Sequence, residues 1–563
     1  MKNNKVKLTI DGRGVECAAG INLIEAARLV GVEIPALCWL KDISTPTACR
    51  VCVVEIEGVN RLMTACNTLV RDGLVVRTAT KRVLDARKTN IELQLSDHSK
   101  NCLSCPKSLK CDLQRLAREY DCDGFAITGS ESCVDLDESH PCLVKDLSKC
   151  IQCSRCIAVC KSVQGVSAIS KIKRGFTAKV GCAHDGKLAD SLCVGCGQCT
   201  LVCPTAALME RNDVAKVIEY LSDPEIITIA QVAPSVRVAL AEEFGAEIGH
   251  FCESKIASAL KAVGFKQVFD VNTGADFTVM EESTELVERI KTGKNLPMFS
   301  SCCPAWFAFV EKFYPQFRKN LSTCKSPTQM LGALIKSYFA HQRKIDAKAI
   351  RVVDIMPCTA KKGERLRGKD VDVCLTTREL AQLLRKKGIK FDKLSDGEFD
   401  SPLGEYSGAA LIFGVSGGVT EAVLRTARGK LDALSTKPVS LQEPAESGGF
   451  TNAVVSGLAN ARKLLDDIIA GKQNPTFVEV MACPGGCVNG GGQPYCEINT
   501  ITPADIVRLR GGSLRAKDAE LKNSPDRHVS HENKTLVTIY KEYLDKTPNL
   551  AHKLFHVEHS AKT

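Results

Sequence analysis

The spacing of the cysteines constrains this chain of 563 residues more than any other feature of its sequence. The pattern C-x2-C-x2-C-x3-C occurs twice, and in such runs three close thiolates bind one cluster while the fourth binds its neighbour. We therefore predict two 4Fe–4S clusters, one on Cys150, Cys153, Cys156 and Cys203 and the other on Cys193, Cys196, Cys199 and Cys160. Zinc is the alternative, but zinc sites usually pair one CxxC with a distant CxxC.

The cysteine total of 29 indicates metal binding rather than disulfides, because disulfide scaffolds are short and secreted. The sequence shows no apolar signal segment and no apolar run of membrane-spanning length, so we expect a cytoplasmic protein without a membrane partner. The net charge of +10 includes no basic block of the nucleic-acid-binding kind, which argues against a nucleic-acid partner. It predicts either a solvated surface or a docking face for an acidic electron carrier.

Two further groups of cysteines precede the repeated runs. Four cysteines in a β-rich segment predict a 2Fe–2S cluster on Cys38, Cys49, Cys52 and Cys66. One histidine before three cysteines predicts a 4Fe–4S cluster with a single nitrogen ligand, on His98, Cys102, Cys105 and Cys111. A neutral imidazole in place of a thiolate removes one negative charge, and net charge helps to set the potential of a cluster. Buried structural cysteines and an ordinary histidine are the alternatives.

Three cysteine-bearing segments distinguish the second half of the chain. They are SSCCPAW at residues 300–306, MPCTAKKGE at 356–364 and EVMACPGGCVNGGGQP at 479–494. Together and in this order they resemble the three signature motifs of the FeFe-hydrogenases, enzymes that interconvert protons, electrons and molecular hydrogen. The resemblance runs through nearly the whole chain, and SHEN at residues 530–533 is similar to the small-subunit segment of that family. The large iron–sulfur subunit of respiratory complex I shares the two N-terminal groups, which therefore do not separate the two families.

The resemblance implies an H-cluster, which is a 4Fe–4S unit linked to a two-iron unit carrying CO, cyanide and a dithiolate. It implies that the 4Fe–4S unit binds Cys303, Cys358, Cys483 and Cys487, and that Cys487 also bridges to the two irons. It further implies that Lys361 and the backbone at Ser235 donate hydrogen bonds to the cyanides, and that Met356 and Met481 pack against the cluster. The glycines at residues 490–492 allow the backbone to approach closely. The expected cofactors are thus one 2Fe–2S cluster, three 4Fe–4S clusters and the H-cluster.

A separate set of residues is predicted to carry protons. Cys302 adjoins a predicted ligand, and in the family this position is the proton donor; a thiol with a reference pKa of about 8.5 exchanges protons near neutrality, unlike a serine. Glu282, Glu285 and Arg289 share one face of a predicted helix, and the two glutamates match the proton relay of the family, with Ser322 between them. A solvated helix face is the alternative. The remaining cysteines are predicted to be structural thiols: Cys17, Cys122, Cys133, Cys142, Cys182, Cys252, Cys324, Cys374 and Cys496.

The predicted organisation has five domains and a mixed α+β and α/β fold. They are a β-grasp 2Fe–2S domain at 1–79, a 4Fe–4S domain with one histidine and three cysteine ligands at 80–125, a two-cluster ferredoxin domain at 126–209, an α/β H-cluster domain at 210–506 and a small-subunit-like segment at 507–563. Within the fourth domain, apolar runs at 226–232, 351–356, 410–413 and 477–481 predict buried parallel strands between helices. Sites in such sheets lie at the carboxyl ends of the strands.

The family resemblance leaves the electron partner open. The expected reaction is reversible oxidation of hydrogen with ferredoxin or a similar small carrier, in the cytoplasm of an anaerobe or in the hydrogenosome of a eukaryote. The main alternative is the catalytic subunit of an NAD(P)-linked or electron-bifurcating complex with flavin-binding partners; the chain has no G-x-G-x-x-G sequence, so a nicotinamide site would lie on such a partner. H-cluster maturation proteins are expected partners in either case. A sensory hydrogenase would tend to lack Cys302, a complex I-like electron-wire subunit would lack the three H-cluster motifs, and an iron–sulfur assembly protein would lack the relay carboxylates.

Overall fold

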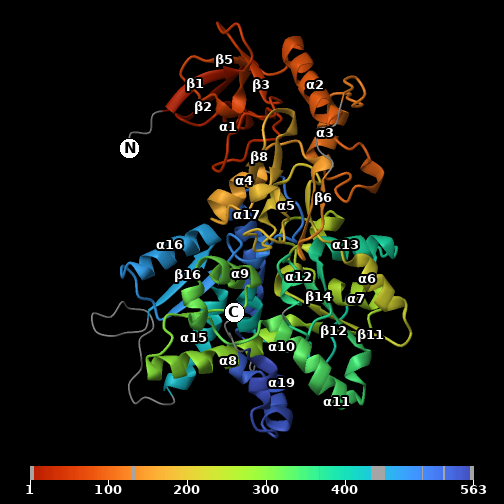
Figure 1. Ribbon diagram of the computed structural model, residues 1–563, viewed down its shortest axis with the longest axis vertical. Coiled ribbons are helices and arrows are strands. Elements are labelled where there is room, and N and C mark those ends of the chain that lie inside the picture. Colours follow the sequence, from red (N-terminus) through yellow and green to blue (C-terminus); the bar gives the residue numbers. More distant parts are fainter. Residues whose placement is uncertain are drawn as a thin grey trace. The chain divides into compact units, whose positions relative to one another are not determined.

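The computed structural model describes residues 5–129, 135–366, 368–432, 451–497, 499–523 and 527–557, so Cys133 lies outside the described residues. The chain divides into two compact units (Figure 1). The first comprises Met1–Ser162, Ser167–Ser191 and Cys199–Met209, and the second comprises Val163–Val166, Leu192–Gln198 and Glu210–Thr563. The division into five domains stays a prediction. Within the described ranges, no helix has the length and apolar character needed to cross a membrane.

The first unit begins with a five-stranded sheet in the order β2-β1-β5-β3-β4. Its strands are β1 (Lys5–Ile10), β2 (Arg13–Ala18), β3 (Val53–Ile56), β4 (Met63–Thr64) and β5 (Val75–Arg77). β1 pairs antiparallel with β2 and parallel with β5. Alternate residues of β1, Leu8 and Ile10, are buried against α1 (Leu23–Arg28), whose N-terminus is closed by a capping box between Asn22 and Glu25. The small β-rich segment predicted around the first four cysteines is therefore confirmed.

The rest of the first unit consists of short elements between the cysteine groups. Its helices are α2 (Lys81–Ser96), α3 (Asp112–Glu119), α4 (Arg155–Ala158) and α5 (Gln198–Val202). A three-stranded sheet has the order β10-β7-β6, with β6 (Leu136–Asp137), β7 (Leu143–Asp146) and β10 (Leu208–Glu210). A hairpin is formed by β8 (Ser170–Ile172) and β9 (Lys179–Gly181). The cysteine runs thus lie mostly in turns and at helix ends, where backbone direction changes within a few residues.

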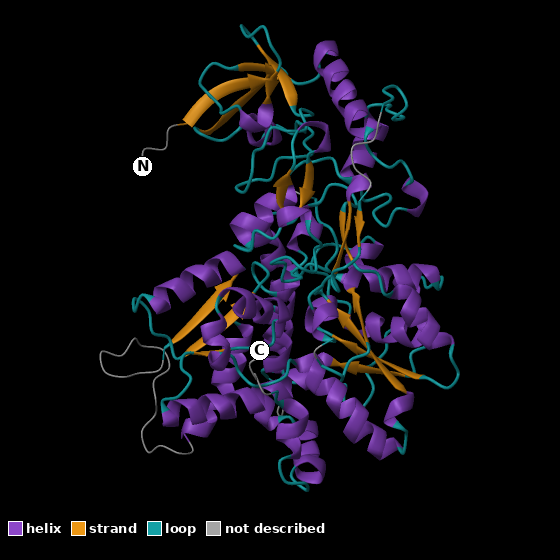
Figure 2. Cartoon of the chain, viewed as in Figure 1, coloured by secondary structure: helices purple, strands orange, loops and turns teal. Residues whose placement is uncertain are grey.

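Two parallel sheets form the framework of the second unit (Figure 2). The first has the order β12-β11-β14-β15, with β11 (Ile227–Val232), β12 (Gln267–Asp270), β14 (Ile350–Met356) and β15 (Val373–Thr376). The second has the order β13-β17-β16, with β13 (Met298–Phe299), β16 (Asn452–Ser456) and β17 (Phe477–Met481). Every neighbouring pair in both sheets is parallel, and the central strands are buried along almost their whole length. Such continuous apolar runs are expected where helices cover both faces of a sheet.

Helices surround these sheets. They are α6 (Val214–Ser222), α7 (Glu253–Val263), α8 (Val271–Thr292), α9 (Pro304–Phe313), α10 (Pro327–Leu334), α11 (Ala340–Arg343), α12 (Lys361–Glu364), α13 (Thr377–Lys386), α14 (Gly408–Leu411), α15 (Gly418–Asp432), α16 (Leu458–Ile469), α17 (Pro503–Ile506), α18 (Gly512–Leu521), α19 (Lys534–Ile539) and α20 (Leu550–Phe555). The longest, α8, packs against α10, α14 and α15, which places it in the interior of the unit. It is the helix on which the predicted relay glutamates lie.

One of the four predicted strands is wrong. Residues 410–413 lie in α14 and in the 3-10 turn Ile412–Gly414, after Ser407, whose hydroxyl accepts a hydrogen bond from the backbone of Ala410 at 3.4 Å. An apolar run of four residues has no period that separates a buried strand from a buried helix, and the cap decided the outcome. The other three runs are confirmed as β11, β14 and β17, while β12, β13, β15 and β16 were not predicted.

Candidate functional site

The three cysteine-bearing segments of the second unit all follow the carboxyl ends of parallel strands. Cys303 follows β13, Cys358 follows β14, and Cys483 and Cys487 follow β17. These thiols are close enough to affect one another: burial, and then the charges of neighbouring cysteines, raise the pKa of Cys483 and Cys487 far above the usual range. Strands that are far apart in sequence therefore bring the four predicted ligands of the 4Fe–4S unit into one buried group.

This donor set fits an iron–sulfur group. None of the cysteines in the described part of the chain forms a disulfide, and thiolates are the ligands that iron–sulfur clusters prefer. Cys303 occupies the N-cap position of α9, with Pro304 as the first helical residue. The buried hydroxyl of Ser300, in the same segment, has no hydrogen-bond partner among the described residues, as expected beside an additional group.

The residues predicted to surround this group lie at the same strand ends. Ser235 follows β11 and is fully buried; its carbonyl accepts a hydrogen bond from Gln493 Nε2 at 2.9 Å. Met356 and Met481 are the last residues of β14 and β17, and both are buried. Lys361 Nζ donates to Glu364 Oε2 at 2.7 Å and to the carbonyl of Cys302 at 3.3 Å, so its ammonium lies beside the first cysteine segment.

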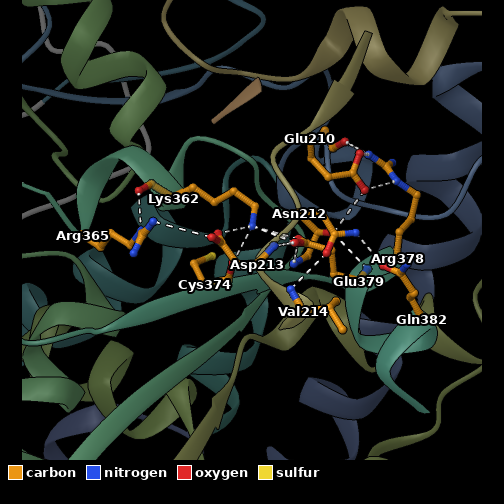
Figure 3. Close-up of polar contacts among 12 residues, drawn as sticks. Glu210, Asn212, Asp213, Val214, Lys362, Arg365, Cys374, Arg378, Glu379 and Gln382 are labelled. Atoms are coloured by element: carbon orange, nitrogen blue, oxygen red, sulfur yellow. Dashed lines mark hydrogen bonds and ion pairs between the residues drawn. The ribbon is translucent and has the colours of Figure 1, made fainter. Parts of the chain in front are cut away.

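The neighbouring lysine has a different environment (Figure 3). Lys362 is fully buried, and its Nζ donates to Asp213 Oδ2 at 2.8 Å, to Glu379 Oε1 at 3.0 Å and to the carbonyl of Cys374 at 2.6 Å. In the same network Arg378 donates to both carboxylate oxygens of Glu210, at 2.9 and 2.6 Å. Lys362 thus fixes the second cysteine segment to β15 and α13.

Arg378 also reaches the third cysteine segment. Its Nη2 donates to the carbonyl of Gly491 at 2.8 Å, and its Nη1 donates to the carbonyl of Gln493. A Cβ on Gly491 would collide with the carbonyl oxygen of Cys196, which agrees with the close backbone approach predicted for these glycines. The charge of Cys196 also contributes to the raised pKa of Cys483. A predicted ligand of the second 4Fe–4S cluster therefore lies next to the buried cysteine group.

The predicted relay begins at α8. Glu282 is 1 % exposed, and neither carboxylate oxygen has a hydrogen-bond partner in the described ranges. Burial, followed by the charge of Glu285, raises its pKa to about 8. A carboxyl group with such a pKa gains and loses a proton near neutral pH, as a general acid or base requires.

One helical turn further, Glu285 is well bonded. Its Oε2 accepts from Ser322 Oγ at 2.7 Å, and its Oε1 accepts from Arg289 Nη2 at 2.5 Å. Arg289 also donates to the carbonyls of Asn320 and Leu321, at 3.0 and 2.9 Å, which holds the arginine against the loop that carries Ser322. Of the predicted set, Glu285, Arg289 and Ser322 thus lie together about one turn beyond Glu282.

Cys302 lies beside Glu282. Burial, followed by the charges of Glu282 and Cys303, raises the pKa of the Cys302 thiol well above its usual range. This differs from the expectation that the thiol titrates near neutrality, because that expectation used the value for a thiol in water. Cys302 is therefore a protonated thiol beside a carboxyl group that titrates near neutral pH.

One buried carboxylate near this site was not predicted. Asp354, in β14, accepts a hydrogen bond from Thr328 Oγ1 at 2.5 Å and another from Gln231 Nε2, and burial raises its pKa to about 7. Its strand was predicted, but an aspartate within an apolar run gives no sign of which side chains will pack against it. Asp354 also contributes to the raised pKa of Lys361.

In the first unit, the four predicted ligands of the first 4Fe–4S cluster line one cavity. The cavity is bounded by Cys150, Cys153, Cys156 and Cys203 together with mostly apolar residues. Such a donor set in an apolar cavity fits a cubane cluster. Of the second set, Cys160 and Cys199 belong to the first unit, and Cys193 and Cys196 belong to the second.

The two N-terminal groups also lie within the first unit. Cys38 is hydrogen-bonded to Cys49 and Cys52 to Cys66, and all four thiols are buried. His98 follows α2; burial lowers its pKa to about 4, and its buried Nδ1 has no hydrogen-bond partner among the described residues. The imidazole is therefore neutral, as a ligand must be. Cys102 begins the 3-10 turn Cys102–Ser104, Cys105 follows this turn, and Cys111 occupies the N-cap position of α3.

One apolar core connects three of these groups. It contains Cys38 and Cys49 of the first group and Cys153 of the first 4Fe–4S set, with Cys111 of the histidine group packed against it. Ligands of these three predicted clusters therefore lie in or against one apolar core.

Successive parts of the chain match five family models. They are a 2Fe-2S iron-sulfur cluster binding domain at residues 3–81, the NADH-ubiquinone oxidoreductase-G iron-sulfur binding region at 87–124, a 4Fe-4S dicluster domain at 149–207, the C-terminal domain of the iron only hydrogenase large subunit at 226–491 and the iron hydrogenase small subunit at 504–562. These matches confirm the predicted fold class, in which iron–sulfur ferredoxin-like domains are joined to an α/β catalytic domain.

Two relatives are similar over almost their full length. The NADP-reducing hydrogenase subunit HndD of Solidesulfovibrio fructosivorans is 41 % identical over 98 % of this chain and 98 % of its own. Iron hydrogenase 1 of Clostridium pasteurianum is 35 % identical over 95 % of this chain and 96 % of its own. A solved structure of an apo FeFe-hydrogenase from Chlamydomonas reinhardtii is 33 % identical with a TM-score of 0.53, and covers 62 % of this chain and 98 % of that one.

Proposed function

Since the chain belongs to the FeFe-hydrogenase family and is an oxidoreductase acting on hydrogen, we propose that it interconverts protons and hydrogen at the buried cysteine group of the second unit. The observation that carries this assignment is that the Cys302 thiol lies beside Glu282, whose pKa is raised to about 8, and beside the four predicted ligand thiols. An H-cluster on Cys303, Cys358, Cys483 and Cys487 would supply the iron-centred redox chemistry there.

The residues of the chain supply the proton path. In the direction of hydrogen evolution, Cys302 Sγ gives its proton at the cysteine group and is reprotonated by the carboxyl group of Glu282. Glu282 then regains its proton from Glu285 by way of the Ser322 hydroxyl; Ser322 Oγ and Glu285 Oε2 are 2.7 Å apart. Arg289 pairs with Glu285 and holds this carboxylate in place at the outer end of the path. The ammonium of Lys361 lies beside Cys302 and would donate to an anionic ligand of the cofactor.

The first unit supplies the electron path. The matched families support 2Fe–2S and 4Fe–4S clusters in addition to the H-cluster. We assign one 2Fe–2S cluster and three 4Fe–4S clusters, one of them with His98 as a ligand. The shared apolar core of the N-terminal ligand groups supports electron transfer from one to the next. The fully loaded chain should then hold about 20 irons.

Ferredoxin or a similar small acidic carrier is the proposed partner, because the chain carries a net charge of +10. The full-length similarity to a relative named as a subunit of an NADP-reducing hydrogenase supports a second candidate, a catalytic subunit within an assembly whose other subunits bind flavin and nicotinamide. A pull-down from native extract separates the two, since only the second retains flavin-containing subunits. Activation would in either case require H-cluster maturation proteins, and the expected compartment is the cytoplasm.

The experiment that tests the proposed function replaces two neighbours of identical chemistry. Cys303→Ser should weaken or lose the 4Fe–4S unit, because a hydroxyl is a poor ligand for iron–sulfur clusters. Cys302→Ser should keep the iron content and the infrared CO and CN bands but lose hydrogen evolution, because a serine does not release a proton near neutral pH. If Cys302→Ser loses the bands while Cys303→Ser keeps them, the two roles are reversed.

The electron path is tested at the unusual ligand. His98→Ala should retain hydrogen evolution with a small artificial donor and lose activity with a protein carrier, because only the second route uses the N-terminal clusters. Equal loss with both donors would instead indicate a folding defect.

A further inference from the structure

A cluster of three metal-binding residue types lies at the outer end of the proposed relay. One side-chain atom each of Glu285, Cys324 and His556 lies within 4.8 Å of the others. Cys324 Sγ is 3.8 Å from Glu285 Oε2 and 4.0 Å from His556 Nδ1. We propose that these three residues form a binding site for one divalent cation of the zinc class, a role that neither the hydrogenase chemistry nor its iron–sulfur clusters require.

The two distances from Cys324 Sγ are close to those of a zinc site. With a Zn–S bond of about 2.3 Å and Zn–N and Zn–O bonds of about 2.0–2.1 Å, the sulfur of a tetrahedral site stands about 3.6 Å from each nitrogen or oxygen ligand. The separations of Sγ from Oε2 and from Nδ1 therefore need to shrink by only a few tenths of an ångström. A cation would take the place of the thiol proton between Cys324 and Glu285. Three protein ligands leave the fourth position open, as in sites that exchange their ligands.

The backbone holds the imidazole next to the thiol. Cys324 and His556 form an antiparallel bridge, in which the backbone N–H of Lys325 donates to the carbonyl of Phe555 at 2.7 Å. The N–H of Val557 donates to the carbonyl of Thr323 at 2.8 Å. Phe555 is fully buried and its ring lies 5.2 Å from that of Phe277 in α8. The histidine is thus fixed at this position by main-chain pairing and by the core.

A second layer of contacts orients the ligands. His556 Nε2 lies 3.1 Å from Glu281 Oε2, and Tyr540 donates its hydroxyl to Glu281 Oε1. Histidines that bind metals usually donate their other ring N–H to a carboxylate, which leaves the remaining nitrogen with its lone pair toward the metal. Here that nitrogen is Nδ1, which lies 4.0 Å from Cys324 Sγ and 2.8 Å from Thr323 Oγ1. Glu285 is held in turn by Ser322 and Arg289.

The local charge favours a cation. Two carboxylates lie at the triad: Glu285 Oε2 is 3.8 Å from Cys324 Sγ, and Glu281 Oε2 is 3.1 Å from His556 Nε2. Arg289 is paired with Glu285 and offsets one of them. Buried negative groups in excess are costly unless a positive charge joins them, and a divalent ion would supply it.

A bound cation would have a consequence that rests on the proposed function. Glu285 Oε2 would then be a metal ligand, and it is the oxygen to which Ser322 donates. A carboxylate held by a divalent cation is a much weaker proton acceptor, so proton supply to Glu282 would slow. The same ion would therefore inhibit turnover reversibly without touching the iron–sulfur clusters.

The test uses the matured full-length protein under anaerobic conditions with zinc chloride as the probe. Zinc binding is measured by equilibrium dialysis and the coordination shell by X-ray absorption, with iron content checked to exclude displacement of cluster iron. The variants are Cys324→Ala, His556→Ala and the outer-layer change Glu281→Gln. Cys252→Ala is the matched control, because Cys252 is also a buried thiol in the second unit but donates only to the carbonyl of Arg237 among the described residues.

Wild type and Cys252→Ala should bind one zinc per chain with one sulfur at about 2.3 Å and lighter ligands at about 2.0 Å. Cys324→Ala and His556→Ala should lose this zinc, and Glu281→Gln should bind it about tenfold to a hundredfold more weakly. Equal binding by wild type, Cys324→Ala and His556→Ala would overturn the proposal, as would a shell with no sulfur or with several. Zinc at the triad with unchanged turnover would support the site and contradict the relay through Glu285, so the two failures are distinguishable.

Discussion

Two buried glutamates of the second unit, Glu210 and Glu282, differ in whether a cation is bonded to the carboxylate. Glu210 is 7 % exposed and Glu282 is 1 % exposed, but only Glu210 has a cation bonded to it. Burial raises the pKa of Glu210, yet Arg378 outweighs burial and leaves that pKa below the usual value. At Glu282, burial and Glu285 act together, and the pKa rises to about 8.

The comparison shows that burial alone does not identify a catalytic carboxylate. A buried carboxylate whose bonded cation outweighs the effect of burial, as at Glu210, stays ionised and acts as a structural anchor. The same group without such a partner changes its protonation state near neutrality, which costs stability and makes proton transfer possible. Four predictions test this distinction.

The largest expected effect is on turnover. Glu282→Gln keeps the shape of the side chain and removes its titration, so hydrogen evolution should fall by about 10²–10⁴-fold, the usual contribution of a positioned acid or base. Iron content and infrared bands should match wild type. Hydrogen evolution within about twofold of wild type would remove Glu282 from the relay.

The next largest effect is expected on stability, in a comparison of substitutions at the adjacent residues Lys361 and Lys362. Lys362→Met leaves Glu379 buried without its cation and leaves Asp213 only the longer ion pair with Arg365, at 3.8 Å, which should lower the free energy of unfolding by about 3–5 kcal/mol. Lys361→Met should cost far less stability but disturb the cofactor site, because Lys361 lies beside Cys302. Calorimetry of the unfolding transition of the second unit measures the loss of stability in each variant, and infrared spectra report on the cofactor site. Equal destabilisation by the two substitutions would mean that both lysines are structural.

The third prediction concerns pH. Because the folded pKa of Glu282 lies near 8 and the ordinary value is 4.5, its ionisation penalty is absent below the lower value, grows between them and is complete above the upper one. Glu282→Gln removes this penalty, so it should stabilise the protein by about 3 kcal/mol more at about pH 9 than at about pH 6, at about 1.4 kcal/mol per unit. A stability difference that does not vary with pH would show that Glu282 is not neutral when buried.

The smallest effect on stability is expected when a substitution keeps the positive charge beside Glu210 but loses the geometry of the guanidinium group. Arg378→Lys retains a cation beside Glu210 but loses the paired hydrogen bonds and the stacking over Tyr495, where the guanidinium lies 4.4 Å from the ring centre. We expect a loss of about 1–2 kcal/mol, smaller than for Lys362→Met. A larger loss in the same calorimetric measurement would mean that the contacts of Arg378 to the third cysteine segment matter more than its charge.

The sequence was sufficient for some of these features and not for others. Cysteine spacing is local, so the ligand groups were predictable, and the position of Glu282 and Glu285 on one helix face follows from helical periodicity. The pairing of Arg378 with Glu210 joins residues 168 positions apart, and no local pattern encodes it. The pKa of Glu282 depends on its burial and on the charge of Glu285, and only the folded packing determines how deeply the carboxyl group is buried. Cys324 was predicted to be a plain structural thiol because its neighbour His556 lies 232 positions away.

The pairing of residues 555–557 with the loop beside α8 has a consequence for biosynthesis. Glu281 and His556 are 275 positions apart, so at about 5–20 residues per second the ribosome needs roughly 15 to 55 seconds to deliver the second after the first. During that interval Phe277, fully buried in the finished fold, lacks the aromatic ring of Phe555 that covers it. This side of α8 is therefore open to water, chaperones and proteases while the rest of the unit is still being made.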